Sequence, residues 1–491
     1  MKTYNTKLLF KLRLWAMSLI VLSIGLVPDT LSQGNKDTHI SFSGRSSSRH
    51  VHIEKGRLNS YELKYRGTIE LTDDDTDIKS ISPGGYFKVS KTTFGNKRSI
   101  YIENKGGQLV KEYYVGRRQE PFIPDGKAWL ADILPEVIRN TGIGAEKRVL
   151  RIYRKSGVNG VLNEISKIDG DYVKGIYFDA LLDQASLNDG DKVRILEGIS
   201  EEMNSSYEQS KLLTNHSGEF IKSQKSAEAF FRSASEISSD YEKGKVLKAA
   251  FNEADVEGAA FGEALEAIST ISSDYEASKL LMHVLASKDL DDERFQEVIE
   301  IVGDISSDYE KGKILNELSD DKDLSDKRFK LLLDSYSEIS SNYEKAKVLK
   351  RLIDEQDLND FKVEEILEAA EHLSSGYESR NVLKKLIQEA EFNDENFETL
   401  LESVDDISSS YDKTNVYKQI LSDLDLEDDE LMSIIDYVSK VSSNYEKSGL
   451  LIIIAKKIPK GNTKLREAFI DAAKSISSDY EYGKVMRSLN G

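Results

Sequence analysis

A short motif that returns at a fixed interval constrains the fold of this chain more than any other feature. It is most complete at residues 237–247, which read Ile-Ser-Ser-Asp-Tyr-Glu-Lys-Gly-Lys-Val-Leu. The spacing between successive motif tyrosines is 35 residues once, then 34 residues seven times, then 35 residues again. A period of this length predicts a solenoid of stacked supersecondary units. The repeat tyrosines are Tyr172, Tyr207, Tyr241, Tyr275, Tyr309, Tyr343, Tyr377, Tyr411, Tyr445 and Tyr480.

Each repeat is predicted to be a helix hairpin. Ser307 and Glu310 have the Ser-x-x-Glu spacing by which a hydroxyl and a carboxylate reciprocally satisfy free amides at a helix start. Ile314, Leu315 and Leu318 then form a helical apolar stripe. After a polar break, a second apolar stripe contains Phe329, Leu332, Leu333, Tyr336 and Ile339. The predicted fold is therefore mainly α, an α-α superhelical solenoid of 34-residue helix hairpins. Its period matches the tetratricopeptide repeat, but the Trp, Leu-Gly and Pro positions of that repeat are not filled.

The position three residues after the tyrosine predicts how closely the repeats approach. It usually holds a small side chain, which would let a neighbouring helix come near, and Arg380 breaks this rule. The small residues are Gly175, Ser210, Gly244, Ser278, Gly312, Ala346 and Gly483.

The tyrosines themselves allow two interpretations. They could fill the groove between adjacent hairpins with the hydroxyl at the rim, or they could form an aromatic track for a ligand. We favour packing, because a residue present in every repeat is expected to serve the repeat itself.

The first 32 residues have the pattern of an export signal. An apolar run over residues 14–27 follows the basic residues Lys2, Lys7, Lys11 and Arg13, and small residues follow it up to Ser32. We predict a signal peptide that is cleaved after Ser32, and an uncleaved anchor is the alternative. The 491 residues contain no cysteine, which excludes disulfides, thiolate metal sites and a lipid-modified cysteine. The predicted location is the bacterial periplasm or the exterior.

The mature chain is predicted to have four parts. Residues 33–50 are polar and rich in serine, which is typical of a flexible tether. Residues 51–120 alternate apolar and polar side chains between Gly-rich turns, which predicts a small antiparallel β-sheet domain. Residues 126–165 are expected to form a helical cap, a degenerate repeat that Pro135 should kink or divide. Residues 166–491 would form about nine full repeats and a terminal helix.

Charge is divided unevenly along the chain. Residues 33–160 carry 23 basic and 15 acidic side chains, a net charge of +8, whereas residues 161–491 carry a net charge of -30. The acidic solenoid argues against nucleic acid and anionic lipid as its partner. The charged residues, 31% of the chain, argue against bulk membrane insertion beyond the signal segment. It would tolerate a basic protein or peptide partner, although a charge run is usually a solvated face.

The residues with catalytic or metal-binding chemistry are few. Asp73, Asp75 and Asp77 alternate as in the opening of a calcium loop, but Ile78 and Gly84 replace the glycine and the glutamate that the loop requires. We favour an acidic hairpin turn over a cation site. The six histidines are scattered without ligand spacing, and no nucleophile elbow, phosphate loop or dinucleotide fingerprint is present. We therefore predict no catalytic, cofactor-binding or metal-binding residues and no cofactor.

Several segments resemble a known group of proteins. Residues 66–85, 112–117 and 129–136, together with the Ser-Ser-Asp-Tyr-Glu repeats, are similar to soluble extracytoplasmic regions associated with bacterial antirepressor-type membrane metallopeptidases and their free-standing relatives. The resemblance implies envelope sensing or regulation through binding. The zinc helix and the membrane spans of the metallopeptidase are absent from this sequence, so protease activity is not carried over.

The leading functional prediction is a non-enzymatic exported scaffold whose solenoid binds a protein or peptide. Two alternatives remain. One is an envelope hydrolase that uses carboxylates of the β domain such as Asp73 and Asp75. The other is a purely structural spacer.

Overall fold

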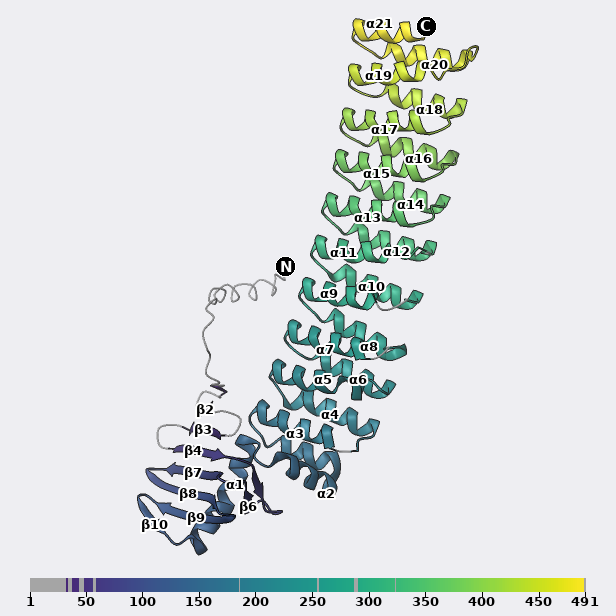
Figure 1. Ribbon diagram of the computed structural model, residues 1–491. Coiled ribbons are helices and arrows are strands. Elements are labelled where there is room, and N and C mark those ends of the chain that lie inside the picture. Colours follow the sequence, from purple (N-terminus) through teal and green to yellow (C-terminus); the bar gives the residue numbers. More distant parts are fainter. Residues whose placement is uncertain are drawn as a thin grey trace, which may run out of the picture. The chain divides into compact units, whose positions relative to one another are not determined.

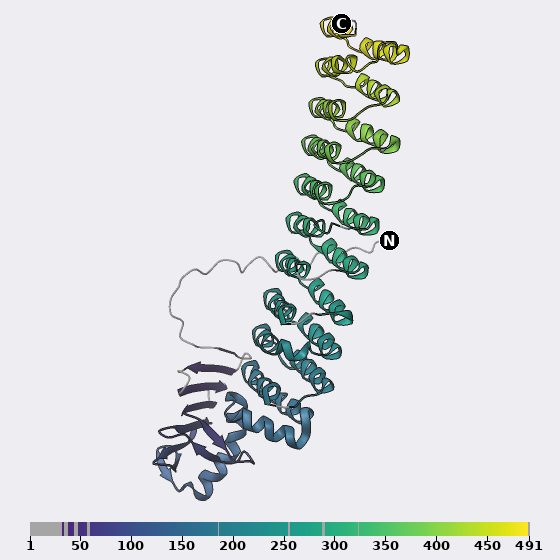
Figure 2. The ribbon, with the colours of Figure 1, turned by 45° about the vertical axis from the view of Figure 1, so that its right-hand side comes forward.

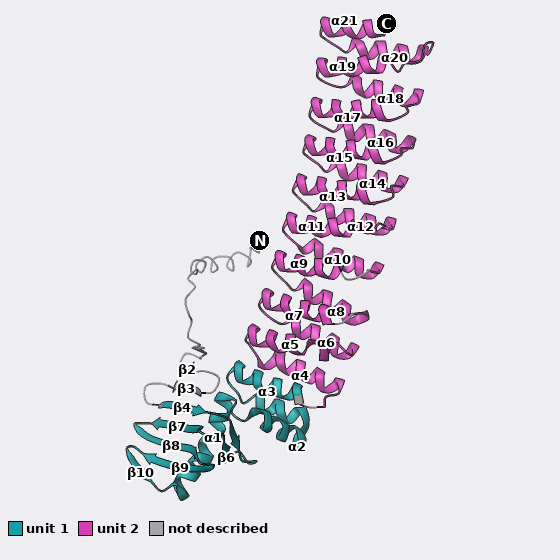
Figure 3. Cartoon of the chain, in the orientation of Figure 1, with its two compact units in different colours: residues 1–185 teal, residues 186–491 magenta. Residues whose placement is uncertain are grey.

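The chain folds into two compact units, residues 1–185 and residues 186–491 (Figure 3). The computed structural model describes residues 32–33, 38–43, 48–55, 59–184, 186–253, 256–286, 290–322 and 324–489. Nearly all of the predicted signal peptide therefore lies outside the described residues. Within the described part of the chain, no helix is long and apolar enough to cross a membrane.

Unit 1 begins with an antiparallel sheet in the order β1-β2-β3-β4-β7-β8-β9-β10, with a separate β5-β6 hairpin. The β domain predicted from period-two alternation is confirmed. Leu63, Val89 and Ile100 sit opposite one another on neighbouring strands and are fully buried. The strands are β1 (Ser32–Gln33), β2 (Thr38–Ser43), β3 (Ser48–Lys55), β4 (Asn59–Arg66), β5 (Ile69–Leu71), β6 (Ile78–Ile81), β7 (Tyr86–Thr93), β8 (Asn96–Lys105), β9 (Gln108–Val115) and β10 (Arg118–Glu120).

The predicted tether is wrong for much of its length. Residues 38–43 form β2, and the register pairs Ile40 with Ile53 and Phe42 with Val51 of β3. The serines of this segment suggested a linker. The alternation of Ile40 and Phe42 with polar neighbours is nevertheless a strand pattern, and pairing with β3 satisfies it.

Three helices complete unit 1: α1 (Lys127–Thr141), α2 (Ala145–Ile165) and α3 (Asp171–Gln184). α1 and α2 match the predicted cap, and the Trp129 ring lies 6.0 Å from the Tyr113 ring of the sheet. α1 is not divided at Pro135; the break falls instead in α2, where Gly157 has a φ of 63°. α3 contains Tyr172 but belongs to unit 1, so the predicted solenoid boundary at residue 166 is too early.

Unit 2 is a stack of helix hairpins in which two rows of helices run side by side (Figures 1 and 2). Each helix contacts the corresponding helix of the adjacent repeat. The predicted solenoid is thus confirmed. We call the helix that starts at the tyrosine motif the first helix and the next one the second helix. The first helices are α5 (Ser206–Phe220), α7 (Asp240–Glu253), α9 (Asp274–Leu285), α11 (Asp308–Leu318), α13 (Asn342–Glu355), α15 (Gly376–Glu389), α17 (Ser410–Asp423), α19 (Asn444–Ala455) and α21 (Asp479–Ser488). The second helices are α4 (Asp189–Glu202), α6 (Gln224–Ser235), α8 (Gly258–Ser269), α10 (Asp292–Asp304), α12 (Asp326–Ser337), α14 (Asp360–Glu371), α16 (Asp394–Asp405), α18 (Asp428–Ser439) and α20 (Thr463–Lys474).

Both predicted apolar stripes are buried. Ile314 and Leu315 of the first helix and Phe329 and Leu332 of the second are fully inaccessible to solvent. The apolar residue four positions before each tyrosine is also buried, as at Ile339. Neither helix of a hairpin could bury its stripe alone, so neighbouring repeats complete one continuous core.

Candidate partner-binding face of the solenoid

The serine that starts each first helix caps it, as predicted, but the reciprocal half of the predicted capping box is not made. The Ser307 hydroxyl accepts from the Glu310 amide at 3.4 Å. The Ser307 amide, which the Glu310 carboxylate was expected to satisfy, donates instead to Asp274 of the preceding repeat at 2.8 Å. The motif therefore caps its own helix and also links two repeats.

In several repeats the residue before the tyrosine forms a link of this kind to the next repeat. Asp240 accepts from the Ser273 amide at 2.9 Å, and Asp308 accepts from the Ser341 amide at 2.8 Å. Asn342 replaces the aspartate in the next repeat and accepts from the Ser374 amide at 2.9 Å. Where this position holds Asp or Asn, its side-chain oxygen fixes the register between consecutive first helices. Ser206 and Ser410 instead bond through their hydroxyls to serines of the next repeat, and Gly376 has no side chain to form such a link.

The small residue three positions after the tyrosine makes room for the glutamate of the next repeat, which confirms the predicted close approach. A Cβ at Gly312 would lie 3.1 Å from a carboxylate oxygen of Glu344, and Ser448 donates to Glu481 at 2.5 Å. Arg380 is the one large residue at this small-residue position. The next repeat also departs from the pattern, because it has the shorter Asp412 in place of the glutamate. The Arg380 guanidinium donates to Asp412 at 2.5 Å, so a long cation and a short carboxylate fill the same space.

A lysine two positions after the tyrosine was missed by the sequence analysis. Lys243 is buried, and its ammonium donates to the hydroxyl of Thr270, the residue at the carboxyl end of α8, at 2.7 Å. Lys447 donates in the same way to Ser475 at the end of α20. A cation is favourable at a helix carboxyl end, where the carbonyls lack partners. Burial lowers the pKa of both lysines.

The tyrosine is the motif position that these contacts do not use. From Tyr207 to Tyr480, the nine repeat tyrosines of unit 2 are between 58% and 71% exposed. The interpretation that they fill the groove between hairpins is therefore wrong. Tyr172 of α3 differs, because it is only partly exposed. The solenoid consequently presents one exposed phenol ring per repeat along its first helices.

Cations accompany these rings. A lysine stands four or seven residues after each tyrosine from Tyr207 to Tyr411, and such positions lie on the same helix face. Lys245 and Lys279 pair with Glu242 and Glu276, each at 3.4 Å. The lysine side chains are nevertheless 43% and 46% exposed, whereas the two carboxylates are 15% and 18% exposed. The residues are Lys211, Lys245, Lys248, Lys279, Lys313, Lys347, Lys350, Lys384 and Lys418. We call the tyrosines of unit 2 and these lysines the tyrosine face.

Hollows lie between consecutive first helices on this face. One of about 130 Å³ is lined by Tyr241, Lys245 and Lys279 and has Leu280 among its apolar groups. A larger one of about 490 Å³ is lined by Tyr411, Arg380, Lys384 and Lys385 together with amide side chains. In these two places the tyrosine face thus offers a concave site that combines a ring with ammonium or guanidinium groups.

The two rows of helices differ strongly in charge. The first helices of unit 2 carry 19 basic and 20 acidic side chains, a net charge of -1. The second helices carry 12 basic and 31 acidic side chains, a net charge of -19. The solenoid is therefore acidic along one row only.

Burial, and after it the charges of neighbouring carboxylates, raise the pKa of two glutamates on the acidic row. Burial, and after it the charges of Glu368 and Glu395, raise the pKa of Glu364. Burial, together with Asp406 and Glu368, raises the pKa of Glu371. Among the residues that the structure describes, no group of three or more His, Cys, Asp or Glu side chains is arranged to hold a metal ion.

Asp73, Asp75 and Asp77 lie in the acidic turn of the β5-β6 hairpin of unit 1, as favoured from the sequence. The Asp75 carboxylate pairs with Arg148 of α2 at 2.7 Å, and Asp77 pairs with Lys111 of β9 at 2.6 Å. Asp73 is exposed. The carboxylates of Asp75 and Asp77 point to cations on different elements, so they do not converge on one point where an ion or a substrate could bind.

Arg148 connects that turn to the helices of unit 1. Its guanidinium also donates to the Tyr177 hydroxyl at 2.8 Å and pairs with Glu164 at 3.0 Å. Burial alone would raise the pKa of Glu164, but Arg139 and Arg148 hold it below its ordinary value. This buried network is structural: its charges are neutralised by one another.

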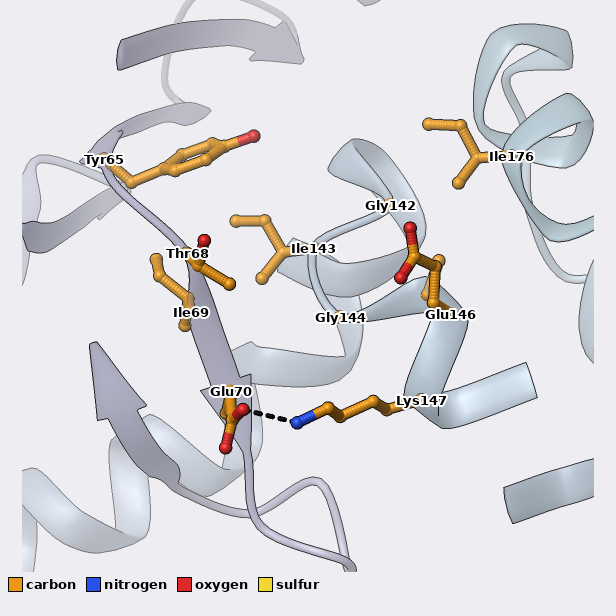
Figure 4. A pocket seen from close by; sticks show the side chains of 11 residues that line it. Tyr65, Thr68, Ile69, Glu70, Gly142, Ile143, Gly144, Glu146, Lys147 and Ile176 are labelled. Carbon is orange, nitrogen blue, oxygen red and sulfur yellow. Dashed lines mark hydrogen bonds and ion pairs between the residues drawn. The ribbon is translucent and has the colours of Figure 1, made fainter. Parts of the chain in front are cut away.

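Unit 1 contains a cavity of about 280 Å³ beside the β5 strand (Figure 4). Tyr65, Ile69, Ile143 and Ile176 supply its apolar walls, and the ion pair of Glu70 with Lys147 crosses one side. The cavity is small for a metabolite site, and its Glu70 and Lys147 side chains are already paired with each other. We assign it no ligand.

Comparisons with known proteins give no information about the function of this chain. No protein-family model and no curated protein sequence matches it. Among solved structures, an engineered protein aligns with 73% of this chain and 96% of its own length, at 13% identity and a TM-score of 0.17. The Chs5-Bch1 exomer cargo adaptor complex aligns with 84% and 85% of the two chains, at 12% identity and a TM-score of 0.17. A circular tandem repeat protein aligns with 75% and 78%, at 11% identity and a TM-score of 0.13. Scores this low carry no argument about function.

Proposed function

We propose that the protein is a non-enzymatic, exported scaffold whose tyrosine face binds an extended acidic segment of a protein or peptide in the cell envelope. One observation supports the proposal above all others. The other positions of the Ser-Ser-Asp-Tyr-Glu motif take part in capping or in joining repeats, whereas the tyrosine remains largely exposed in nine successive repeats. A ring kept in every repeat without being buried has a use outside the core.

The chemistry of the tyrosine face indicates what would bind there. Tyrosine gives a rigid apolar surface with a hydroxyl at its edge and is enriched at interaction hot spots. The ammonium groups beside it pair with the mostly covered motif glutamates but stay largely exposed, so they could also contact carboxylates of a partner. A segment with acidic and apolar side chains satisfies both requirements.

An extended peptide fits this face better than a nucleic acid does. The first helices have a net charge of -1, and residues 161–491 have a net charge of -30. A nucleic acid, with one negative charge on every nucleotide, would be repelled by the rest of the acidic solenoid. A short acidic peptide segment would contact only the tyrosine face, where the exposed lysines lie. The role in envelope sensing or regulation that the sequence resemblance implies stays a prediction.

A second candidate is a basic partner along the second helices. α14, α16 and α18 together carry 14 acidic side chains and one basic side chain. This row could attract a cationic protein, as the sequence analysis predicted, but it lacks the regular aromatic positions that make an interface specific.

The two candidates are separated by matched variants of the full chain. Tyr241, Tyr275 and Tyr309 are replaced together by serine, and as a control the exposed Glu368, Glu402 and Asp436 of the second helices are replaced by their amides. A partner captured from envelope extract by the unaltered protein is identified and its affinity for each form is measured. We expect the tyrosine variant to lose about 100-fold in affinity, from roughly 1 kcal/mol per ring, without a change in melting temperature. Full affinity of the tyrosine variant together with lost affinity of the amide variant would overturn the proposal in favour of the acidic row.

A further inference from the structure

A turn in unit 1 holds a residue that local structure does not favour. Phe94 and Gly95 form the two-residue connection between β7 and β8, in which Thr93 pairs with Asn96. Both residues have positive φ, 49° for Phe94 and 81° for Gly95. Two-residue hairpin turns with this geometry prefer Asn or Asp before Gly, because a larger side chain is strained at positive φ.

Burial does not compensate Phe94 for this strain. The ring is 76% exposed. A Cβ placed at Gly95 would meet nothing within 4 Å, so the turn projects into open space. A bulky apolar side chain that is both strained and exposed indicates a contact outside the chain rather than a role in the fold.

The neighbouring turn adds cations around the ring. The β9-β10 connection lies at the same end of the sheet, since the Gly116 amide donates to the Lys97 carbonyl at 2.7 Å (Figure 1). Residues 91–99 and 113–119 contain five basic side chains and no acidic one. We call the exposed apolar and cationic side chains of these turns the tip cluster: Phe94, Lys97, Arg98, Val115, Arg117 and Arg118.

The cations of the tip cluster are largely unpaired. Arg118 pairs with Glu120 at 3.1 Å. Lys97, Arg98 and Arg117 form no ion pair with other residues that the structure describes. The cluster therefore joins an apolar ring at the outermost point of a turn with guanidinium and ammonium groups whose charges remain available.

We propose that the tip cluster binds the surface of a membrane that contains anionic lipids. The Phe94 ring enters the boundary between headgroups and acyl chains, and the cations contact lipid phosphates. A protruding tip suits a soft apolar phase better than it suits a small ligand, which needs a concave site. The inference concerns unit 1 alone and is independent of the function proposed for the solenoid.

The test uses the full chain and sedimentation with two kinds of vesicle, phosphatidylcholine alone and phosphatidylcholine with one third phosphatidylglycerol. Any vesicle binding by the apolar run over residues 14–27 is the same background in every variant, because no variant changes that run. We expect the unaltered protein to bind the anionic vesicles at least about tenfold more strongly, with an affinity that salt reduces. Phe94→Asn is expected to lower this affinity about tenfold while leaving the melting temperature unchanged or higher, since asparagine suits the turn. The double change of Arg117→Gln with Arg118→Gln is expected to lower it at least tenfold.

Matched controls have comparable exposed residues elsewhere. Lys88→Gln alters an exposed lysine in the middle of β7, and Phe361→Ser alters a ring of α14 that is 40% exposed. Both should bind vesicles as the unaltered protein does. The proposal is overturned if the unaltered protein shows no preference for anionic vesicles, or if the Phe94→Asn protein binds them with undiminished affinity. A Phe94→Trp protein adds a direct readout, because its extra emission should shift to shorter wavelength only with anionic vesicles.

Discussion

The first helices of the solenoid carry 19 basic and 20 acidic side chains, and the second helices carry 12 and 31, although both rows build the same core. Each row also has its own aromatic residues. Phe329 of a second helix is fully buried, whereas Tyr309 of the preceding first helix is 60% exposed. A repeated aromatic residue can therefore have one of two roles. Phe329 packs in the core between repeats, whereas Tyr309 lies on the surface and contributes little to the core.

The largest expected difference in stability is between the alanine variants of these two aromatic residues. Phe329→Ala should lower the free energy of unfolding by about 3 to 5 kcal/mol, because it leaves a cavity in the core. Tyr309→Ala should change it by less than about 0.5 kcal/mol. Chemical denaturation of both variants measures the contrast. A comparable loss from Tyr309→Ala would contradict the distinction between the two rows.

The next effect concerns the way in which first helices join. Arg380→Gly should destabilise the protein by about 2 kcal/mol, through loss of a partly buried charged hydrogen bond and the introduction of glycine into a helix. Adding Asp412→Glu should restore at least half of this loss, because the pair then reproduces the Gly312 and Glu344 arrangement. A double-mutant cycle measures the coupling. If the losses of stability from Arg380→Gly and Asp412→Glu were strictly additive, the two residues would not be energetically coupled.

A stabilising change is expected at the same contact in another repeat. One carboxylate oxygen of Glu344 is buried and makes no hydrogen bond within the described residues. Gly312→Ser should supply a donor, as Ser448 does for Glu481, and should raise the free energy of unfolding by about 1 kcal/mol. Gly312→Ala is the control, since it adds the Cβ without the hydroxyl. Equal effects of both substitutions would exclude the hydrogen bond as the cause.

The smallest effect is a pH dependence of the acidic row. Glu364 and Glu371 have raised pKa values in the folded chain, so the folded state binds their protons more tightly than the unfolded state does. Their contribution to stability therefore rises as the pH falls from neutral through these raised values toward the ordinary glutamate value of 4.5. Melting curves of the Glu364→Gln with Glu371→Gln protein should show less of this rise than those of the unaltered protein. An identical pH profile would show that crowding on this row has no energetic consequence.

The repeat, its two helices and its core could be predicted from the sequence because they follow from local periodicity. The exposure of the tyrosine could also have been read from the same pattern. At about 100° per residue, the core positions five, six and nine residues after the tyrosine centre on about 180°, directly opposite the ring. The lysines four and seven residues later fall within about 40° of the ring. The assumption that a repeated aromatic residue must be buried outweighed this geometry.

Other features depend on contacts between distant residues and could not be read locally. Asp274 binds the amide of Ser307, 33 positions later, only because stacking brings two repeats together. The same stacking turns the Arg380 and Asp412 exceptions into a matched pair. In unit 1, by contrast, the strand over residues 38–43 has a local signal, the alternation of Ile40 and Phe42, but the serine-rich composition outweighed it in the prediction.

The central claim is that the partner lies along the tyrosine face, and crosslinking tests it most directly. A photo-crosslinking phenylalanine analogue is placed at Tyr275 of a first helix in one protein and at Phe361 of a second helix in another, since both positions hold an exposed ring. After irradiation in intact cells, we predict a discrete crosslinked partner from position 275 and none from position 361. Crosslinks from position 361 alone would contradict the account.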